Sequence, residues 1–156
     1  MNFFISSPWR NKEAVKSLEA ALKLSGHGVW SFLDNGANLT TGAPVCEEVK
    51  QFGHSIVDWE DDPLIARVFD SEMQALRSCD ALILLESAGR SSLTEAGIAY
   101  GLGKKVILVG PVERPEIVYH IFPLAGRYPS VDAFLKDPST PAATNAERFE
   151  PAPPSP

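Results

Sequence analysis

The chain has 156 residues, a net charge of −6 and an apolar content of 44%, values that suit one acidic globular domain. The negative charge argues against a surface for a nucleic acid polymer, although a local group of N–H donors can still bind one nucleotide. The two cysteines are too few for a disulfide framework, and neither they nor the three histidines have metal-site spacing. We expect neither a metal nor a cofactor.

The first residues, MNFFISSPWR, lack the basic start and long apolar run of a signal peptide. No apolar stretch approaches the ~20 residues that span a bilayer. The sequence therefore predicts a cytoplasmic protein without a membrane partner.

The first third of the chain alternates strand and helix patterns. We expect a buried strand, an amphipathic helix and a second strand over residues 2–7, 12–24 and 28–33. Residues 34–60 are the least regular part, and a short helix over residues 45–52 is the only element expected there.

The same alternation continues after residue 60. Asp61, Asp62 and Pro63 suit the first turn of a long helix. Residues 80–85 (DALILL) are a continuous apolar run, typical of a central parallel strand that is covered on both faces. A helix from Ser91 or Ser92 to Leu102, a strand and a last short helix follow, the last two over residues 106–109 and 131–135.

Strands that alternate with helices indicate an α/β fold with a parallel, right-handed sheet. We expect this domain to cover residues 1–136. Residues 137–156 contain six prolines in twenty residues and no apolar periodicity, which indicates a flexible proline-rich tail. A proline-motif ligand is the alternative interpretation of this segment.

The loop at residues 87–90 follows the central strand, and ligands of open α/β sheets bind at the carboxyl ends of strands. Gly89 lets the backbone approach a ligand, Arg90 adds a charge, and Ser91 and Ser92 add hydroxyl donors beside the unpaired N–H groups of a helix start. The pattern predicts a cradle for an anion or for sugar hydroxyls.

Glu95 has two interpretations of equal weight. Ser92-Leu93-Thr94-Glu95 has the form of a capping box, in which the glutamate only bonds back to the Ser92 N–H. Helical spacing instead places Glu95 with Ile98, Ala99 and Leu102 on the stripe that packs on the sheet. A carboxylate held there suits nucleophilic attack or stabilisation of a cation.

Two other candidates have a structural alternative. Asp70, within the long predicted helix, can be a solvated surface acid. Trp9, just after the first strand, can line a pocket or cover the edge of the core.

The segment DSEMQALRSCDALILLESAGRSSLTEAGIAYGLGKKVILVG, residues 70–110, resembles the nucleoside 2-deoxyribosyltransferase family, in particular members with a CDA…GRSxxxExG core. The resemblance covers roughly residues 2–136. It implies a flavodoxin-like or Rossmann-like three-layer sandwich with a parallel central sheet, and an enzyme that acts on an N-glycosidic bond.

The resemblance also implies roles for individual residues. Glu95 matches the nucleophile, which forms a covalent glycosyl ester that a second base or water resolves. Asp70 matches the acid that positions or protonates the base. The residues expected to line the substrate come from the first strand end and from the loop, namely Ser6, Ser7, Trp9, Gly89, Arg90, Ser91 and Ser92.

Two positions depart from the family pattern. The tyrosine that bonds the nucleophile in many members aligns with Phe4, and the loop before Glu95 lacks an aspartate. Arg90 and the serines suit a 5′-phosphate, so hydrolysis of a nucleoside monophosphate is expected beside deoxyribosyl transfer. The alternatives are a TIR-like NAD glycohydrolase and a non-catalytic nucleotide sensor. The family also implies a homo-oligomer.

Overall fold

The structure is a computed structural model and describes residues 1–33, 61, 63–112, 119 and 126–137. Its elements are β1 (Asn2–Ser6), a 3-10 turn η1 (Trp9–Asn11), α1 (Lys12–Leu24), β2 (Gly28–Ser31), α3 (Pro63–Ser78), β3 (Ala81–Leu85), α4 (Arg90–Gly101), β4 (Lys105–Val109), β5 (Arg127–Tyr128) and α5 (Val131–Lys136). The helix expected over residues 45–52 and the proline-rich tail lie outside the described residues, except that Asp137 is described.

The strands form one sheet in the order β2-β1-β3-β4-β5, and every neighbouring pair is parallel. β3 lies at the centre, and all five of its residues are buried. Strands β1 and β3 pair with Phe4 opposite Leu82 and Ser6 opposite Leu84. The parallel α/β sheet expected from the sequence is confirmed.

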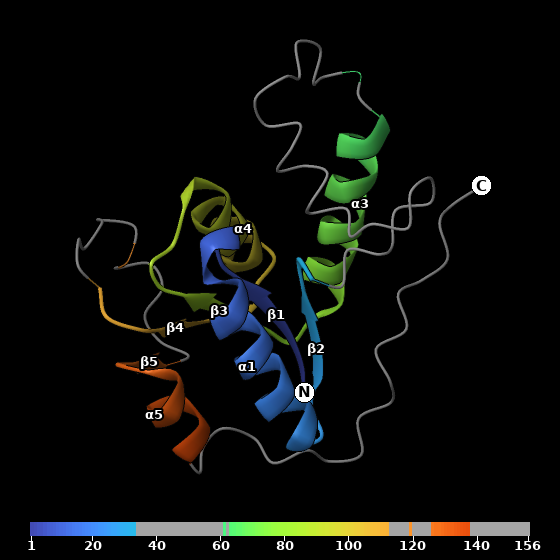
Figure 1. Cartoon of the computed structure of the whole chain (residues 1–156). Helices are drawn as coiled ribbons and strands as arrows, with labels where there is room; N and C mark the ends of the chain where they lie inside the picture. Colours follow the sequence, from blue (N-terminus) through green and yellow to red (C-terminus); the bar gives the residue numbers. More distant parts are fainter. Residues whose placement is uncertain (34–60, 62, 113–118, 120–125, 138–156) are drawn as a thin grey trace.

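The sheet has a separate apolar core on each face. One core joins Phe3, Ile5 and Ile83 to Val15 and Leu18 of α1 and includes Phe134 of α5. The other joins Phe4, Leu82 and Leu84 to side chains of α3 and α4, namely Met73, Ala75, Leu76, Ala96 and Ala99. Alternate strand residues point to opposite faces, so the molecule has the three layers of a Rossmann-like fold, which are visible in Figure 1.

Some boundaries differ from the sequence expectation. The second strand ends at Ser31, and α4 begins at Arg90. Strand β5 was not predicted, because two residues, Arg127 and Tyr128, carry no apolar period; pairing with Leu108 and Val109 creates it. The sequence left open whether residues 119–122 form a strand or a short helix. Of these only Tyr119 is described, and it packs against the core that contains Phe4 and Leu82.

The order of the strands reverses between β1 and β3. The chain leaves β1 through α1 towards β2 on one side, and leaves β3 through α4 towards β4 on the other. A crevice at such a reversal, outside the carboxyl ends of the strands, is where open α/β sheets bind ligands. In Figure 1, β1 runs towards the upper left and β3 towards the left, so their carboxyl ends lie on the side where α1 and α4 begin.

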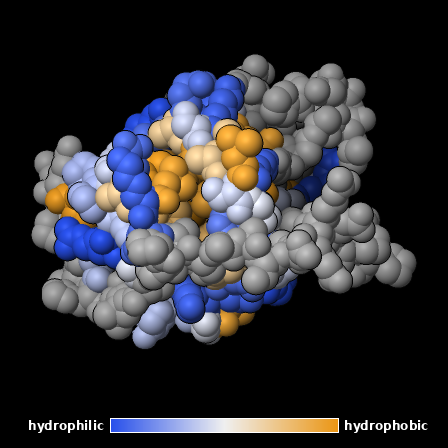
Figure 2. Space-filling model, turned by 90° about the horizontal axis from the view of Figure 1, so that it is seen from below, coloured by the Kyte–Doolittle hydropathy of each residue, from blue (hydrophilic) through white to orange (hydrophobic). Residues whose placement is uncertain are grey.

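Figure 2 shows the lower side of the molecule as it is drawn in Figure 1. Figure 2 views the molecule from below, where hydrophobic side chains gather in the middle of the face with hydrophilic ones around them. Leu24, the last residue of α1, is 90% exposed. Within the described ranges, no helix has the length and apolar composition needed to cross a membrane.

Candidate active site at the carboxyl ends of β1 and β3

Glu95 is joined to the end of β1 by a short hydrogen bond. The hydroxyl of Ser6, the last residue of β1, lies 2.5 Å from Oε2 of Glu95 and 3.2 Å from the carbonyl oxygen of Ser92. Ser6 is 1% exposed. The contact therefore fixes the carboxyl of Glu95 above the strand reversal, as the sequence predicted.

The capping-box interpretation of Glu95 is wrong. Helix α4 begins at Arg90 with Gly89 as its N-cap, and no side chain caps it. Glu95 therefore lies five residues into the helix, beyond the unpaired first N–H groups. Its Oε2 accepts from Ser6 and not from the Ser92 N–H. The Ser-x-x-Glu pattern was misleading because the helix starts two residues before Ser92.

The predicted packing stripe of α4 is only partly confirmed. The buried residues are Ser92, Ala96 and Ala99, whereas Glu95 and Ile98 are partly buried. Leu102 is 44% exposed, contrary to the prediction, because the helix ends at Gly101 and Leu102 is its C-cap. Glu95 thus borders the packed stripe, a position that suits a group that meets both protein and ligand.

Burial changes the acidity of Glu95. Desolvation raises its pKa to about 7, Ser6 opposes this rise by donating its hydrogen bond, and the negative charge of Glu72 adds to it. At neutral pH both ionisation states of Glu95 are therefore populated. Carboxyl groups with such shifted pKa values are concentrated at functional sites.

Glu72 belongs to α3, which packs beside α4, and it is the acid of α3 that acts on Glu95. The family resemblance implies a different acid of α3, Asp70, for a different role, to position or protonate the base. A helix turns by about 100° per residue, so residues two apart point about 200° apart. Glu72 is partly buried next to the buried Met73, whereas Asp70 is exposed. Glu72, which the sequence did not indicate, thus acts on Glu95 through its negative charge.

Glu72→Gln should lower the pKa of Glu95 by about half a pH unit, because it removes a nearby like charge. Asp70→Asn, the matched loss of a carboxylate on the same helix, should leave that pKa unchanged. Carbon-13 NMR titration of the Glu95 carboxyl measures both. An equal change in the pKa of Glu95 in the two variants would contradict the prediction, because it would show that Glu72 and Asp70 affect Glu95 to the same extent.

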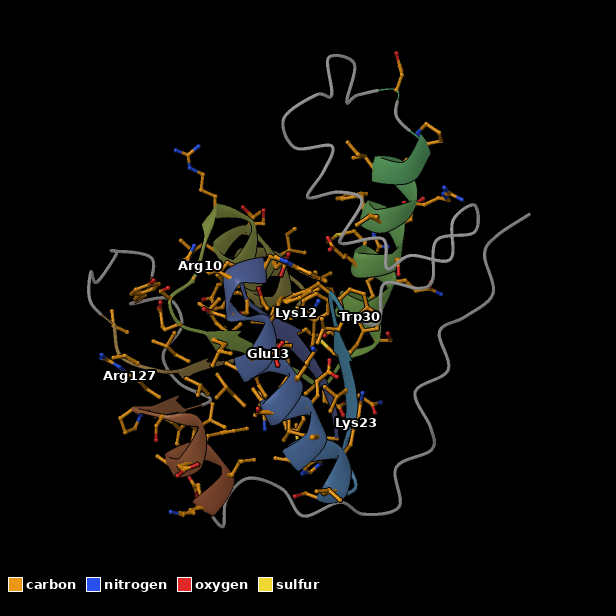
Figure 3. All side chains as sticks on the ribbon, viewed as in Figure 1. Arg10, Lys12, Glu13, Lys23, Trp30 and Arg127 are labelled. Atoms are coloured by element: carbon orange, nitrogen blue, oxygen red, sulfur yellow. The ribbon has the colours of Figure 1, made fainter. Side chains whose placement is uncertain are left out.

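The loops after β1 and β3 are tied together. Arg10 donates to the carbonyl and the hydroxyl of Ser87, at 2.8 and 2.9 Å. Asn11 donates to the hydroxyl of Ser7 at 3.0 Å and to the carbonyl of Glu86 at 3.3 Å. Figure 3 shows Arg10 at the same end of the molecule as the start of α4, whereas Lys23 lies near the other end of α1.

Two of the residues predicted to line the substrate, Ser7 and Trp9, have partners within the protein. Ser7 is 8% exposed and its hydroxyl already accepts from Asn11, so it holds the loop together. Trp9 packs against Phe32, with ring centroids 5.0 Å apart, and Lys12 lies 4.5 Å above its ring. Arg10 and Asn11 were missed because nothing in a single sequence shows which loop they reach.

The start of α4 presents the remaining predicted residues. Gly89 lies against Pro8, and a Cβ at Gly89 would be 3.7 Å from the Cβ of Pro8. Arg90 and Ser91 are exposed, whereas Ser92 is 2% exposed and offers its carbonyl oxygen to Ser6. Arg90 and Ser91 are therefore available to a ligand, while Ser92 supports the interior of the site.

The hydroxyl partner of Glu95 comes from Ser6 and not from the position of Phe4. Phe4 is buried and stacks on Trp30 with ring centroids 4.6 Å apart. Since side chains of a strand alternate, Ser6 lies on the same face as Phe4 and one step closer to the carboxyl edge. The sequence analysis assigned Ser6 to the substrate, and the two-residue period of β1 was the signal that could have identified it as the partner of Glu95.

The described residues hold no group of three or more His, Cys, Asp or Glu side chains suited to a metal ion. Cys79 is a buried free thiol whose pKa is raised to about 11, mainly by desolvation. Cys79 is thus a core side chain with little thiolate character.

No protein-family model and no curated protein matches this sequence. Among solved structures, the chain is similar to the 2-deoxyribosyltransferase of the psychrotolerant bacterium Bacillus psychrosaccharolyticus, with 18% identity, a TM-score of 0.60 and coverage of 90% of this chain and 95% of that one. It also matches the CMP N-glycosidase BcmB of Clostridium botulinum, with 15% identity, a TM-score of 0.48 and coverage of 86% and 96%. The chain therefore has the Rossmann-like fold of the 2-deoxyribosyltransferase.

Proposed function

We propose that the protein cleaves the N-glycosidic bond of a nucleoside or nucleoside 5′-monophosphate and transfers the sugar to a second base or to water. The observation that carries this proposal is the Ser6–Glu95 contact at the strand reversal. It holds a carboxylate, partly buried and with a pKa of about 7, where this class of fold binds ligands. The fold shared with a 2-deoxyribosyltransferase supports the same class of reaction.

The proposed reaction has two steps. Since Ser6 engages Oε2, the other oxygen of ionised Glu95 attacks the anomeric carbon. A C–O bond forms, the C–N bond breaks, and its electron pair passes to the leaving base, which takes up a proton. A second base or water then attacks the same carbon and releases Glu95, which is the retaining logic of a double displacement.

The proton for the leaving base needs an acid beside Glu95. We propose that Asp70 of α3, the residue implied by the family resemblance, positions or protonates the base, whereas Glu72 of the same helix acts on Glu95 through its negative charge. At the other end of the substrate, Arg90 and Ser91 are exposed at the start of α4. A fixed positive charge and a hydroxyl beside helix N–H groups suit a 5′-phosphate.

Free base released from a panel of nucleosides, nucleoside monophosphates and NAD tests this proposal, with chromatography as the readout. We expect release from a nucleoside or its monophosphate and none from NAD. A 2-fluoro-deoxyribosyl substrate should trap the ester, adding the mass of the sugar to a peptide that contains Glu95. Thermal stabilisation by a nucleotide without base release would instead indicate a sensor. Release from NAD alone would indicate a glycohydrolase of the TIR-like class.

A further inference from the structure

The hydroxyl of Ser6 has two acceptors but only one proton. It lies within hydrogen-bond distance of Oε2 of Glu95 and of the carbonyl oxygen of Ser92, at 2.5 and 3.2 Å. A serine hydroxyl donates once and accepts through two lone pairs. It therefore cannot serve both oxygens at the same time.

The charge of Glu95 decides between these acceptors. An ionised carboxylate is the stronger acceptor, so it takes the Ser6 proton in a short, charge-assisted bond. When the carboxyl is protonated, it becomes a donor to Ser6 Oγ, and the Ser6 proton is then free to turn to the Ser92 carbonyl. In both states the buried hydroxyl keeps its hydrogen bonds, which is what a site of 1% exposure requires.

We infer that Ser6 is the positioning residue of Glu95, and that its hydroxyl proton moves between Glu95 Oε2 and the Ser92 carbonyl as the carboxyl gains and loses its charge. The inference extends the proposed function, because the same rotation follows when Glu95 becomes an ester. The ester carbonyl carries no charge and is therefore a weaker acceptor than the carboxylate, so the Ser92 carbonyl competes better for the Ser6 proton. Ser6 thus serves the free and the glycosylated site with one side chain.

The neighbouring charges are compatible with this arrangement. Of the elements that pack against α4, α3 provides Glu72, whose negative charge favours the protonated form of Glu95. On that face of the sheet, β1 places the polar residues Asn2 and Ser6, of which Asn2 begins the strand, at the end opposite Ser6. β3 and β4 contribute apolar side chains there, namely Leu82, Leu84, Val106 and Leu108. Ser6 is therefore the one group of β1, β3 or β4 among the described residues that offers a hydrogen bond to ionised Glu95.

A titration of the substrate-free protein tests the inference without any catalysis. The carboxyl carbon of Glu95 and the carbonyl carbon of Ser92 are followed by carbon-13 NMR. In the wild type, the Ser92 signal should move downfield as pH falls, with the same midpoint as Glu95. In Ser6→Ala, the midpoint of Glu95 should rise by about one pH unit, because the ionised form loses its donor. The Ser92 signal should then lose the part of its change that depends on a hydrogen bond.

Ser7→Ala is the matched control, since Ser7 is the adjacent buried serine and its hydroxyl bonds to Asn11. It should leave both midpoints unchanged, and Ser6→Thr, which keeps a hydroxyl, should retain the coupled titration. If Ser6→Ala does not fold, the inference is tested in the wild type alone, by whether the Ser92 carbonyl signal titrates with the midpoint of Glu95. A Ser92 carbonyl that does not follow Glu95, or equal shifts in the two alanine variants, would overturn the inference. A coupled titration in a protein that releases no base would preserve it and refute only the proposed function.

Discussion

Glu95→Gln should reduce base release by about 10³-fold or more, because an amide cannot form the glycosyl ester. The substitution preserves size and leaves an oxygen to accept from Ser6, so the packing at the end of β1 is retained. The measurement is kcat/KM on the substrate that the panel identifies. In the wild type, kcat/KM should rise with pH and level off above about pH 7, since attack requires the ionised carboxylate.

Two variants sharpen this result. Glu13→Gln, the same chemical change at an exposed residue paired with Lys16, should keep wild-type activity. Glu95→Ala leaves room beside the anomeric carbon, so added azide should restore base release and yield a glycosyl azide. Base release that persists at wild-type rates in both Glu95 variants would exclude Glu95 as the nucleophile.

Glu95→Gln should also stabilise the protein at alkaline pH. The pKa of Glu95 is about 7 in the folded protein, compared with the ordinary value of 4.5 that applies to the unfolded chain. Folding therefore favours the protonated form: stability from this group is complete below pH 4.5 and is lost as pH rises to 7. At about 1.4 kcal/mol per pH unit, ionised Glu95 lowers the free energy of unfolding by about 3 kcal/mol above pH 7.

Urea unfolding at pH 4 and pH 8 measures this effect. The stability of Glu95→Gln relative to the wild type should increase by about 3 kcal/mol between the two pH values. Glu13→Gln should differ from the wild type by less than about 1 kcal/mol at either pH, as expected for an exposed ion pair. A pH-independent difference between Glu95→Gln and the wild type would mean that Glu95 ionises as freely as in the unfolded chain. Together, the two predictions describe a site in which ionised Glu95 is needed for activity and at the same time lowers the free energy of unfolding.

Local patterns were sufficient for most of the architecture. The spacing of Val15, Leu18 and Leu22 predicted α1, which the structure confirms over Lys12–Leu24. The run DALILL predicted a central strand, and β3 is buried along its whole length. These elements were predictable because burial on one helix face or on both sheet faces leaves a period in the sequence. Strand β5 leaves no such period, because its neighbour β4 and not its own composition makes it a strand.

The candidate site was predictable in part. Its location followed from the carboxyl-end rule and a glycine-containing loop, and its central carboxylate from helical phase. Pattern could not decide whether Glu95 caps its helix, because the answer depends on a helix start at Arg90, two residues before Ser92. The family resemblance implied Asp70 as the acid that positions or protonates the base, and that role stays a prediction. No pattern indicated Glu72, whose charge acts on Glu95.

The sequence by itself determined the order of the elements, the parallel sheet and the edge of that sheet where chemistry is expected, because each depends on a local period or on strand direction. Only the tertiary structure decided which side chains meet there. Ser6 and Glu95 are 89 residues apart, and Arg10 and Ser87 are 77 apart. Contacts across such distances arise from the pairing of β1 with β3 and the packing of α4, and no local pattern records them.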